Sequence, residues 1–509
     1  MDNLDKLKEV HMSLHQACLK NEVAEVLNLV RKKLNVNDKN DNLDTPLHLA
    51  CKSKYKNWDI IKCLIENHDD VNAVNKTMET PLHVACRFNS SLKIIQLLID
   101  HNANINVKNE EYYTPLHIAC EIALEENRVK LLLENGADVD AQTKSGNTPL
   151  MLASNNKNEQ ILKLLLDFSA NMELKTYTSQ ETALIVASRL NYSPNMRLLI
   201  ENNADVNVTN NLGWSPLSIA CYNQNDRVVD LILKRFLDCD DVHLISHHAS
   251  TALLEACKVK KNVHIVKKLL DHHANVNEQN VNGQTPLHIA CQYVNSVSLI
   301  QLLLDHQADC LVKDHHGCSP LHIASSFPGK YQIVDLLLRF GAKVNEANDK
   351  GLTPLLQACS INDFDTISVL LNHHAEVNVY HSPPMSFSGF SRRKIMSPLF
   401  YACKANSLNI IQLLLQHGAD VHLFTTESPL HIAFHKNNLL ATKLLLDQGA
   451  SILALDNAGD SVFELSVRQR HSSMLSLFLS QHPHLIHHQF QPNESLLHVL
   501  IEDKDMYFY

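Results

Sequence analysis

The chain repeats one pattern of apolar and polar positions along almost its whole length. A short apolar stretch led by Thr or Ser, as in Thr45–Cys51 (TPLHLAC) and Thr114–Cys120 (TPLHIAC), precedes a longer stripe with helical spacing, as in Ile161–Leu166. Thr and Ser are favoured helix N-caps, and Pro at the next position occupies N1, where its missing N–H costs nothing. Each copy therefore predicts a short first helix and a second helix with one apolar face.

The distance between copies predicts the architecture. Fourteen intervals range from 31 to 44 residues and average 34.5. A fixed period of this size indicates a solenoid, because one helix pair can bury its apolar faces only against neighbouring pairs. The first position of the stretch, called the Thr slot below, is held by Met12, Thr45, Thr80, Thr114, Thr148, Thr182, Ser215, Thr251, Thr285, Ser319, Thr353, Ser397, Ser428, Ser461 and Ser495.

The second helix of each copy ends where the chain must reverse. Gly is favoured there because it adopts a left-handed backbone without steric cost, and Asn tolerates that conformation better than other residues. The sequence predicts left-handed residues at Gly136, Gly341, Gly418, Gly449, Asn102, Asn203, His273, Gln307 and His374. This use of other residue types accounts for part of the low glycine content, 12 in 509 residues.

The repeated Thr-Pro-Leu-His stretch, together with Leu131–Leu150 (LLLENGADVDAQTKSGNTPL), resembles the ankyrin repeat. The resemblance implies an all-α repeat solenoid, an ankyrin-repeat superhelix of antiparallel helix pairs joined by β-hairpin-like loops. It also implies that the His of the stretch bonds to the Thr slot and ties adjacent hairpins together. The motif residues are Thr45, Pro46, His48, Thr80, His83, Thr114, His117, Thr285, His288, His322 and His431.

Departures from the period suggest boundaries. We expect an N-terminal capping repeat and first hairpin in residues 1–44, repeats in 45–379, an inserted loop at 380–396, repeats in 397–494, and an incomplete repeat or cap, trimmed or truncated, at 495–509. Pro, Ser and Gly mark the inserted loop. Its segment Ser391–Lys394 suits either phosphorylation and docking or plain solvation.

Composition narrows the classes of function. The net charge of −10 argues against a nucleic-acid partner, which usually meets a basic face. No apolar run approaches the roughly 18 residues of a membrane span, so we expect no direct membrane insertion. Nine of the 13 cysteines share one position of the repeat, which favours a small buried hydrophobe over a disulfide. Reduced cysteines indicate the cytoplasm or, alternatively, the nucleus.

The candidate chemistry is sparse. Eight of the 31 histidines occupy the His position of the repeated stretch, and adjacent histidines such as His272-His273 do not converge on one ion. Gln481–His488 suits either a weak zinc site or solvated surface. No Gly-rich phosphate loop and no His-Glu-x-x-His motif occurs. We expect no enzyme activity and no catalytic, cofactor or metal site.

What remains is surface. We expect a monomeric protein–protein interaction scaffold or adaptor that binds a protein partner on its concave face. The alternatives are a substrate-recognition arm of a ubiquitin-ligase complex and the ankyrin portion of a larger channel or latrotoxin-like membrane-associated protein. The resemblance places partner contacts at the hairpin tip before the Thr slot and at the two residues after the Ala-Cys pair. These positions hold Tyr113, Trp214, Tyr222, Gln292, Tyr293 and Phe327, with Arg87 and Phe88 nearer the N-terminus.

Overall fold

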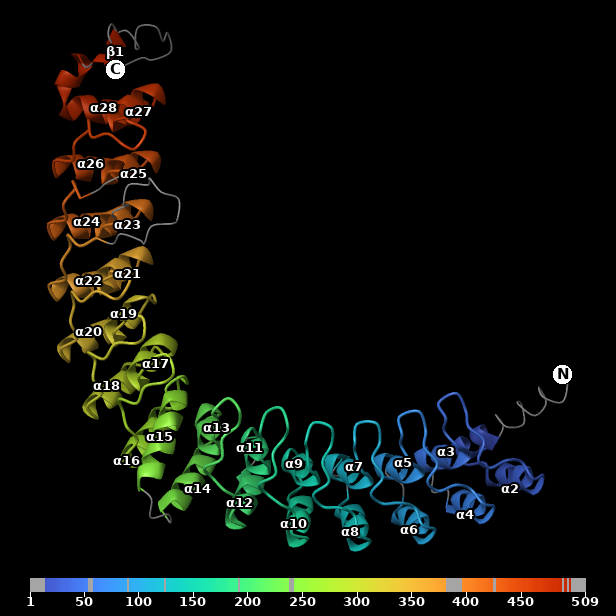
Figure 1. Ribbon diagram of the computed structural model, residues 1–509. Coiled ribbons are helices and arrows are strands. Elements are labelled where there is room, and N and C mark those ends of the chain that lie inside the picture. Colours follow the sequence, from blue (N-terminus) through green and yellow to red (C-terminus); the bar gives the residue numbers. More distant parts are fainter. Residues whose placement is uncertain are drawn as a thin grey trace. The chain divides into compact units, whose positions relative to one another are not determined.

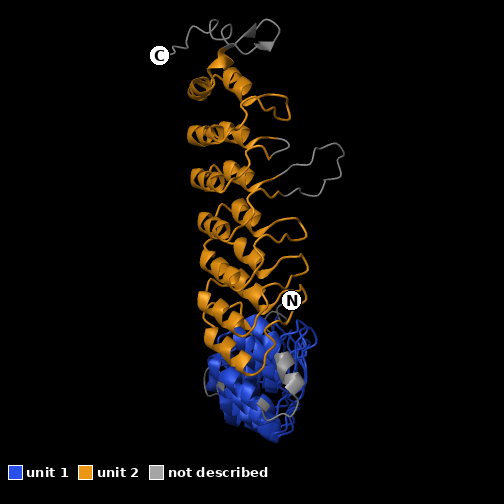
Figure 2. Cartoon of the chain, turned by 90° about the vertical axis from the view of Figure 1, so that its left-hand side faces the viewer, with its two compact units in different colours: residues 1–255 blue, residues 256–509 orange. Residues whose placement is uncertain are grey.

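The computed structural model describes residues 14–53, 58–88, 91–122, 125–190, 193–237, 242–380, 396–423, 427–487, 489–491 and 494–495. The chain divides into two compact units, unit 1 at Met1–Glu255 and unit 2 at Ala256–Tyr509 (Figure 2). Within each unit, helix pairs stack in sequence order with hairpin loops along one side (Figure 1). The predicted all-α repeat solenoid is confirmed.

Unit 1 alternates short first helices with longer second helices, as the apolar pattern predicts. Residues 14–20 are helical and precede the numbered elements. The first helices are α3 (Pro46–Lys52), α5 (Pro81–Arg87), α7 (Pro115–Ile122), α9 (Pro149–Ser154), α11 (Ala183–Ser188) and α13 (Pro216–Tyr222). The second helices are α2 (Val23–Arg31), α4 (Trp58–Glu66), α6 (Leu92–Asp100), α8 (Glu126–Glu134), α10 (Glu159–Asp167), α12 (Ser193–Glu201) and α14 (Asp226–Leu237).

Unit 2 has the same alternation, and α15 (Val242–Ala256) lies at the division between the units. Its first helices are α17 (Pro286–Tyr293), α19 (Pro320–Ser325), α21 (Pro354–Ser360), α23 (Pro398–Lys404), α25 (Pro429–His435) and α27 (Val462–Arg468). Its second helices are α16 (Val263–Asp271), α18 (Val297–Asp305), α20 (Tyr331–Arg339), α22 (Phe364–Asn372), α24 (Leu408–Gln416), α26 (Leu439–Asp447) and α28 (Ser472–Gln481). The 3₁₀ helix η1 (Pro483–His487) and the strands β1 (Gln489–Gln491) and β2 (Glu494–Ser495) follow.

The Thr slot caps the first helices as predicted. Thr148 has an extended backbone, its hydroxyl accepts a hydrogen bond from the N–H of Met151, and Pro149 begins α9. The prediction is wrong at Thr251, which lies inside the 15-residue helix α15 and starts no helix. The missing proline after Thr251 does not explain this, because Thr182 and Ser461 also lack a following Pro and still cap α11 and α27. Ser495 lies in β2 opposite Gln489 and caps no helix either.

The reversals after the second helices are left-handed at all nine predicted positions, from His273 at φ 62° to Gly341 at φ 90°. The nine cysteines that share one position of the repeat are all buried, as the pattern predicts. Residues 1–13, 381–395 and 496–509, which hold the leader, most of the inserted loop and nearly all of the last segment, lie outside the described residues. None of the helices in the described part of the chain combines the length and the apolar character that a membrane span requires.

Candidate functional site

The repeated histidines join each hairpin to the next. In α3 the backbone N–H of Thr45 donates to Nδ1 of His48 at 3.1 Å, and the Thr45 hydroxyl lies 2.9 Å from the same nitrogen. Nε2 of His48 donates to the carbonyl of Glu79, 31 residues on, at 2.9 Å. The same pair of contacts recurs at His83, His117 and His288. The predicted structural role of this histidine is confirmed.

These contacts require a neutral imidazole. A backbone N–H can donate only to an unprotonated Nδ1, so the proton sits on Nε2. Burial lowers the pKa of His117 to about 4 and also lowers the pKa values of His48, His83 and His288. The imidazoles therefore carry no charge near neutral pH.

The neighbouring thiols are not activated. Burial raises the pKa of Cys86 and of Cys291 to about 12, so the thiolate that would act as a nucleophile or metal ligand is disfavoured. Both nitrogens of each histidine named above are already engaged in hydrogen bonds within the fold. The Thr-Pro-Leu-His-x-Ala-Cys stretch is thus scaffolding, and the described residues contain no group of three or more His, Cys, Asp or Glu placed to hold a metal ion.

We call the residue before the Thr slot and the residue eight positions later a rim pair. In five repeats the two residues contact each other. Three of these pairs form ion pairs, one hydrogen-bonds and one is aromatic. They are Glu79–Arg87 at 2.5 Å, Glu181–Arg189, Gln284–Gln292 at 3.4 Å, Asp460–Arg468 at 2.8 Å, and Trp214–Tyr222 with ring centroids 5.4 Å apart.

Trp214 and Tyr222 form the aromatic rim pair of unit 1. Their rings meet edge to face at an interplanar angle of 72°. Trp214 is half-buried against Ile185, Val208 and Ile219, which anchors the indole, while Tyr222 at the end of α13 is 47% exposed. Edge-to-face packing of this kind adds about 0.5–1.5 kcal/mol beyond simple area burial. The pair is a fixed aromatic surface within one repeat, and its role as a partner-contact patch stays a prediction.

The other predicted contact residues fall into two groups. Tyr113 is half-buried 5.5 Å from the ring of His117, and Arg87 is held by Glu79, so both also serve the fold. The side chain of Gln292 makes the rim contact, and its backbone carbonyl accepts a hydrogen bond from Nζ of Lys330. Phe88, Tyr293 and Phe327 are exposed, and lysine ammonium groups lie over the rings of Phe88 and Phe327.

Sequence reasoning missed one surface, the hairpin tips two residues before the Thr slot. These positions have positive φ throughout the described hairpins, with Gly146, Gly213, Gly283, Gly317, Gly351 and Gly459 at six of them. In unit 1 the same slot also holds Leu43, Met78, Tyr112 and Gln180. The recurrence of Gly at this position was the available signal.

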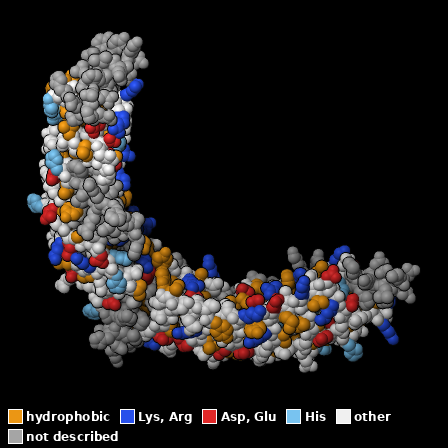
Figure 3. All heavy atoms as spheres, turned by 45° about the horizontal axis from the view of Figure 1, so that its top comes forward, with side chains coloured by type: hydrophobic (Ala, Val, Ile, Leu, Met, Phe, Trp, Pro, Cys, Tyr) orange, Lys and Arg blue, Asp and Glu red, His pale blue; other side chains and the backbone are white. Residues whose placement is uncertain are grey.

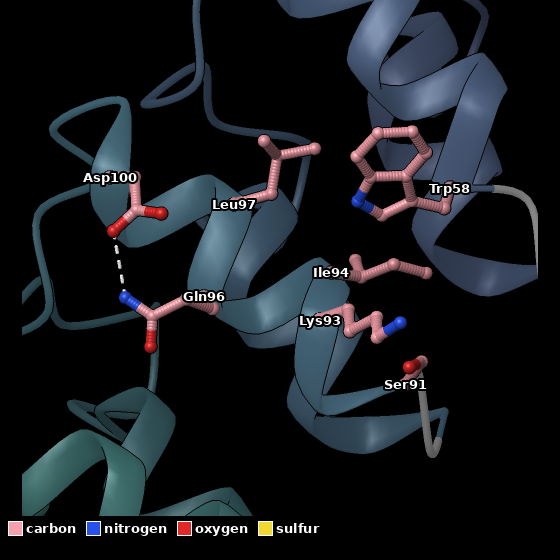
Figure 4. A pocket seen from close by; sticks show the side chains of 7 residues that line it. All are labelled: Trp58, Ser91, Lys93, Ile94, Gln96, Leu97 and Asp100. Carbon is pink, nitrogen blue, oxygen red and sulfur yellow. Dashed lines mark hydrogen bonds between the residues drawn. The ribbon is translucent and has the colours of Figure 1, made fainter.

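A separate concavity of about 530 Å³ lies on the second helices of unit 1. Figure 4 shows the indole of Trp58 on α4 facing the aliphatic side chains of α6, with Gln96 bonded to Asp100 away from it. Its wall carries no nucleophile paired with a base and therefore offers no catalytic arrangement. The lining residues are Trp58, Ser91, Lys93, Ile94, Gln96, Leu97 and Asp100.

Comparisons with known proteins agree with this architecture. The family model for ankyrin repeats matches overlapping segments from residues 14–109 to residues 399–489, which together span 14–489. The chain is 39% identical over 59 residues to the mitochondrial disaggregase of Bos taurus, covering 12% of this chain and 9% of that protein. It is 28% identical over 136 residues to neurogenic locus notch homolog protein 1 of Danio rerio, covering 27% and 6%.

A bacterial relative is aligned over a larger share of its own length. The chain is 32% identical over 108 residues to the ankyrin repeat protein YahD of Escherichia coli (strain K12), covering 21% of this chain and 52% of that protein. The matches thus span less than a tenth of the disaggregase and of the notch homolog, and about half of YahD. With the family model matched along nearly the whole length and the helix pairs, caps and histidine ties in place, the chain belongs to the ankyrin-repeat family.

Proposed function

We propose that the chain is a non-enzymatic interaction scaffold that binds a protein partner along its first helices and hairpins. Ankyrin repeats are in general protein–protein interaction modules. The aromatic rim pair Trp214–Tyr222 carries the proposal, because it places a partly exposed aromatic surface on a rigid support. Large rigid aromatics lose little entropy when a partner binds, and they dominate the energetics of protein interfaces.

We also propose a reducing compartment, the cytoplasm or alternatively the nucleus. The nine repeated cysteines support this proposal, because each is a buried free thiol in a different helix pair. The charge distribution supports a protein partner over nucleic acid. Figure 3 shows Lys and Arg interspersed with Asp and Glu over unit 1, with no continuous basic face in that view.

Replacing Trp214 and Tyr222 together by Ala should abolish capture of the partner from cell extract. Each side chain is a candidate hot spot, for which truncation typically costs about 2 kcal/mol or more in binding. The measurement is a quantitative pull-down of wild type and Trp214→Ala/Tyr222→Ala, with a chemical crosslink and identification of the retained protein. Thermal melts of both proteins accompany it.

The control is Phe168→Ala, which removes an exposed aromatic beyond the end of α10, away from the rim pairs. This variant should keep the partner. Unchanged capture by the double variant would refute the rim surface as the binding site. A large drop in its melting temperature would show that the pair serves packing instead.

A further inference from the structure

The first repeat of unit 2 carries a local excess of lysine. Five of the 11 residues from Lys258 to Lys268 are lysine, and no Asp or Glu occurs between Glu255 and Asp271. The whole chain has 45 Lys and Arg in 509 residues, about one in 11, and its net charge is −10. This segment is therefore strongly basic within an acidic protein.

Three of these lysines are exposed without an acidic partner. Lys260 and Lys261 lie in the connection between α15 and α16, just before the N-cap residue Asn262, and Lys267 lies on α16 itself. No ion pair joins the ammonium groups of these three exposed lysines to an acid among the described residues. His264, also exposed, lies three residues before Lys267 and so on the same side of α16. We call Lys260, Lys261, His264 and Lys267 the basic patch.

The basic patch destabilises the helix that carries it. The N-terminal end of a helix has a partial positive charge, so nearby cations are unfavourable there and nearby anions are favourable. Lys260 and Lys261 precede the first residue of α16, and the first turn of this helix has no acid. Patterns that break a local rule without a gain in folding are expected at functional sites. Other second helices do carry an acid in the first turn, namely Glu25, Asp59, Glu126, Glu159, Asp226 and Asp365.

The basic patch is distinct from the rim pairs and the hairpin tips. The rim position of this repeat, eight residues after Ser250, is Lys258. The patch begins two residues beyond it, follows the connection between the helices and continues onto the second helix. A partner bound there would contact a part of the repeat that the rim pairs do not use.

The extent of the basic patch favours a short acidic segment of a protein. The exposed Asp271 ends α16 and the exposed Asp305 ends α18, while residues 293–296, the corresponding connection of the next repeat, hold no charged residue. An anionic membrane or a nucleic acid presents phosphates over a wide area and would bring them close to these carboxylates. A few consecutive Asp or Glu residues can pair with the lysines of the patch alone.

We propose that the basic patch binds an acidic segment of a protein partner, with Asp or Glu side chains of the segment paired to Lys260, Lys261 and Lys267. The inference rests on the proposed scaffold function for the class of partner and adds a second contact surface to it. Carboxylates at this position would offset the unfavourable charge at the start of α16. Complementary charges of this kind speed association and exclude partners of the wrong sign.

The test measures fluorescence anisotropy of a labelled peptide of eight Glu residues titrated with the full chain. Wild type should bind this peptide saturably, should not bind a peptide of eight Gln residues, and should bind more weakly as salt screens the charges. The variant Lys260→Glu/Lys261→Glu/Lys267→Glu should bind at least about tenfold more weakly, because its charges repel the peptide. Its melting temperature should be equal or higher, because Glu near the start of α16 is favourable to the helix.

The matched control is Lys404→Glu/Lys436→Glu/Lys443→Glu, which reverses three other exposed lysines of unit 2 and changes the net charge by the same amount. This variant should bind the Glu peptide nearly as wild type does. Equal weakening in the two triple variants would show that overall charge, and not the basic patch, governs binding.

Other results would also overturn the basic patch. They are absence of saturable binding to wild type, tighter binding of wild type to phosphatidylserine vesicles or to single-stranded DNA than to the Glu peptide, and a lower melting temperature of the patch variant. Trp214→Ala/Tyr222→Ala should bind the Glu peptide as wild type does, and loss of binding would place the peptide on the rim pair instead. The peptide titration and the capture from cell extract can therefore fail independently.

Discussion

Asp69→Ala is expected to raise the free energy of local unfolding around α4 by about 3–4 kcal/mol at pH 7.5. Asp69 follows α4 in a slot that holds Ala103, Ala137 and Ala204 in other repeats. Its side chain is only 8% exposed, and its carboxylate has no side-chain hydrogen-bond partner among the described residues. The backbone N–H of Asp70 gives it weak support that does not offset burial. An ionised carboxylate buried with so little support is costly, and Ala removes that cost while fitting the repeat.

The pH dependence of this gain follows from the pKa of Asp69. Burial, with a smaller contribution from the charge of Asp70, raises the pKa from 3.8 to about 7. Because the pKa is raised in the folded state, the stability that protonated Asp69 contributes is complete below about pH 4. It is lost as the pH rises through 7. The advantage of Asp69→Ala should therefore shrink to about 1 kcal/mol at pH 4.5.

Hydrogen exchange of peptides covering α4, Trp58–Glu66, measures this local free energy, because repeat proteins open in local units. Asp69→Asn removes the charge at nearly the same volume and should recover part of the gain. Asp70→Ala, at an exposed neighbour, should recover only the small part that comes from the charge of Asp70, and it loses the hydrogen bond that Asp70 Oδ1 accepts from the N–H of Asn72. Faster exchange in Asp69→Ala than in wild type would show that the carboxylate stabilises the native repeat.

Acidification is expected to destabilise both units through the buried histidines of the repeated stretch. Their pKa values are lowered in the folded chain, that of His117 from 6.5 to about 4. Stability from such a group is complete above pH 6.5 and is lost as pH falls toward 4, because the unfolded chain takes up protons first. His117 alone contributes about 3 kcal/mol over this window. His48, His83, His288, His322 and His431 have pKa values shifted in the same direction by burial.

Guanidinium unfolding followed by circular dichroism at pH 7.5, 6.0, 5.0 and 4.5 tests this prediction. His117→Met copies the next repeat, where Met151 fills the same position. It should reduce the number of protons that the chain takes up on unfolding by up to one. It also loses the bond to the carbonyl of Asn147, so its stability at pH 7.5 should be lower. The exposed His101→Gln serves as control and should leave the pH dependence unchanged. An identical pH dependence in His117→Met would contradict the assignment.

The sequence alone predicted the scaffold and little of the surface. Helix starts, reversals and buried cysteines followed from the pattern, whereas Thr251 lies inside α15 and Ser495 lies in β2. For the candidate contact residues, the sequence indicated only the position of each residue within its repeat and not the side chains that it contacts. Glu79 as the partner of Arg87, and the edge-to-face geometry of Trp214 and Tyr222, became visible only in the folded repeat.

Several polar contacts that cross between repeats were beyond sequence reasoning. Nη1 of Arg128 donates to the carbonyl of Cys86, 42 residues earlier, and Nζ of Lys330 donates to those of Cys291 and Gln292. Asn195 likewise donates to the carbonyls of Ser154 and Asn156. Each side chain satisfies carbonyls at the end of a first helix in the preceding repeat, where the helix itself leaves them unpaired.

The sequence by itself determined the period, the caps and the reversals of this protein, because each depends on residues only a few positions apart. The tertiary structure decided which carbonyls the buried polar side chains reach and that the carboxylate of Asp69 is buried. It also decided that Leu43, Met78 and Tyr112 stay about half exposed at positive φ. Those properties depend on how neighbouring repeats stack, and stacking sets distances between residues about 30 to 40 positions apart that no local pattern encodes.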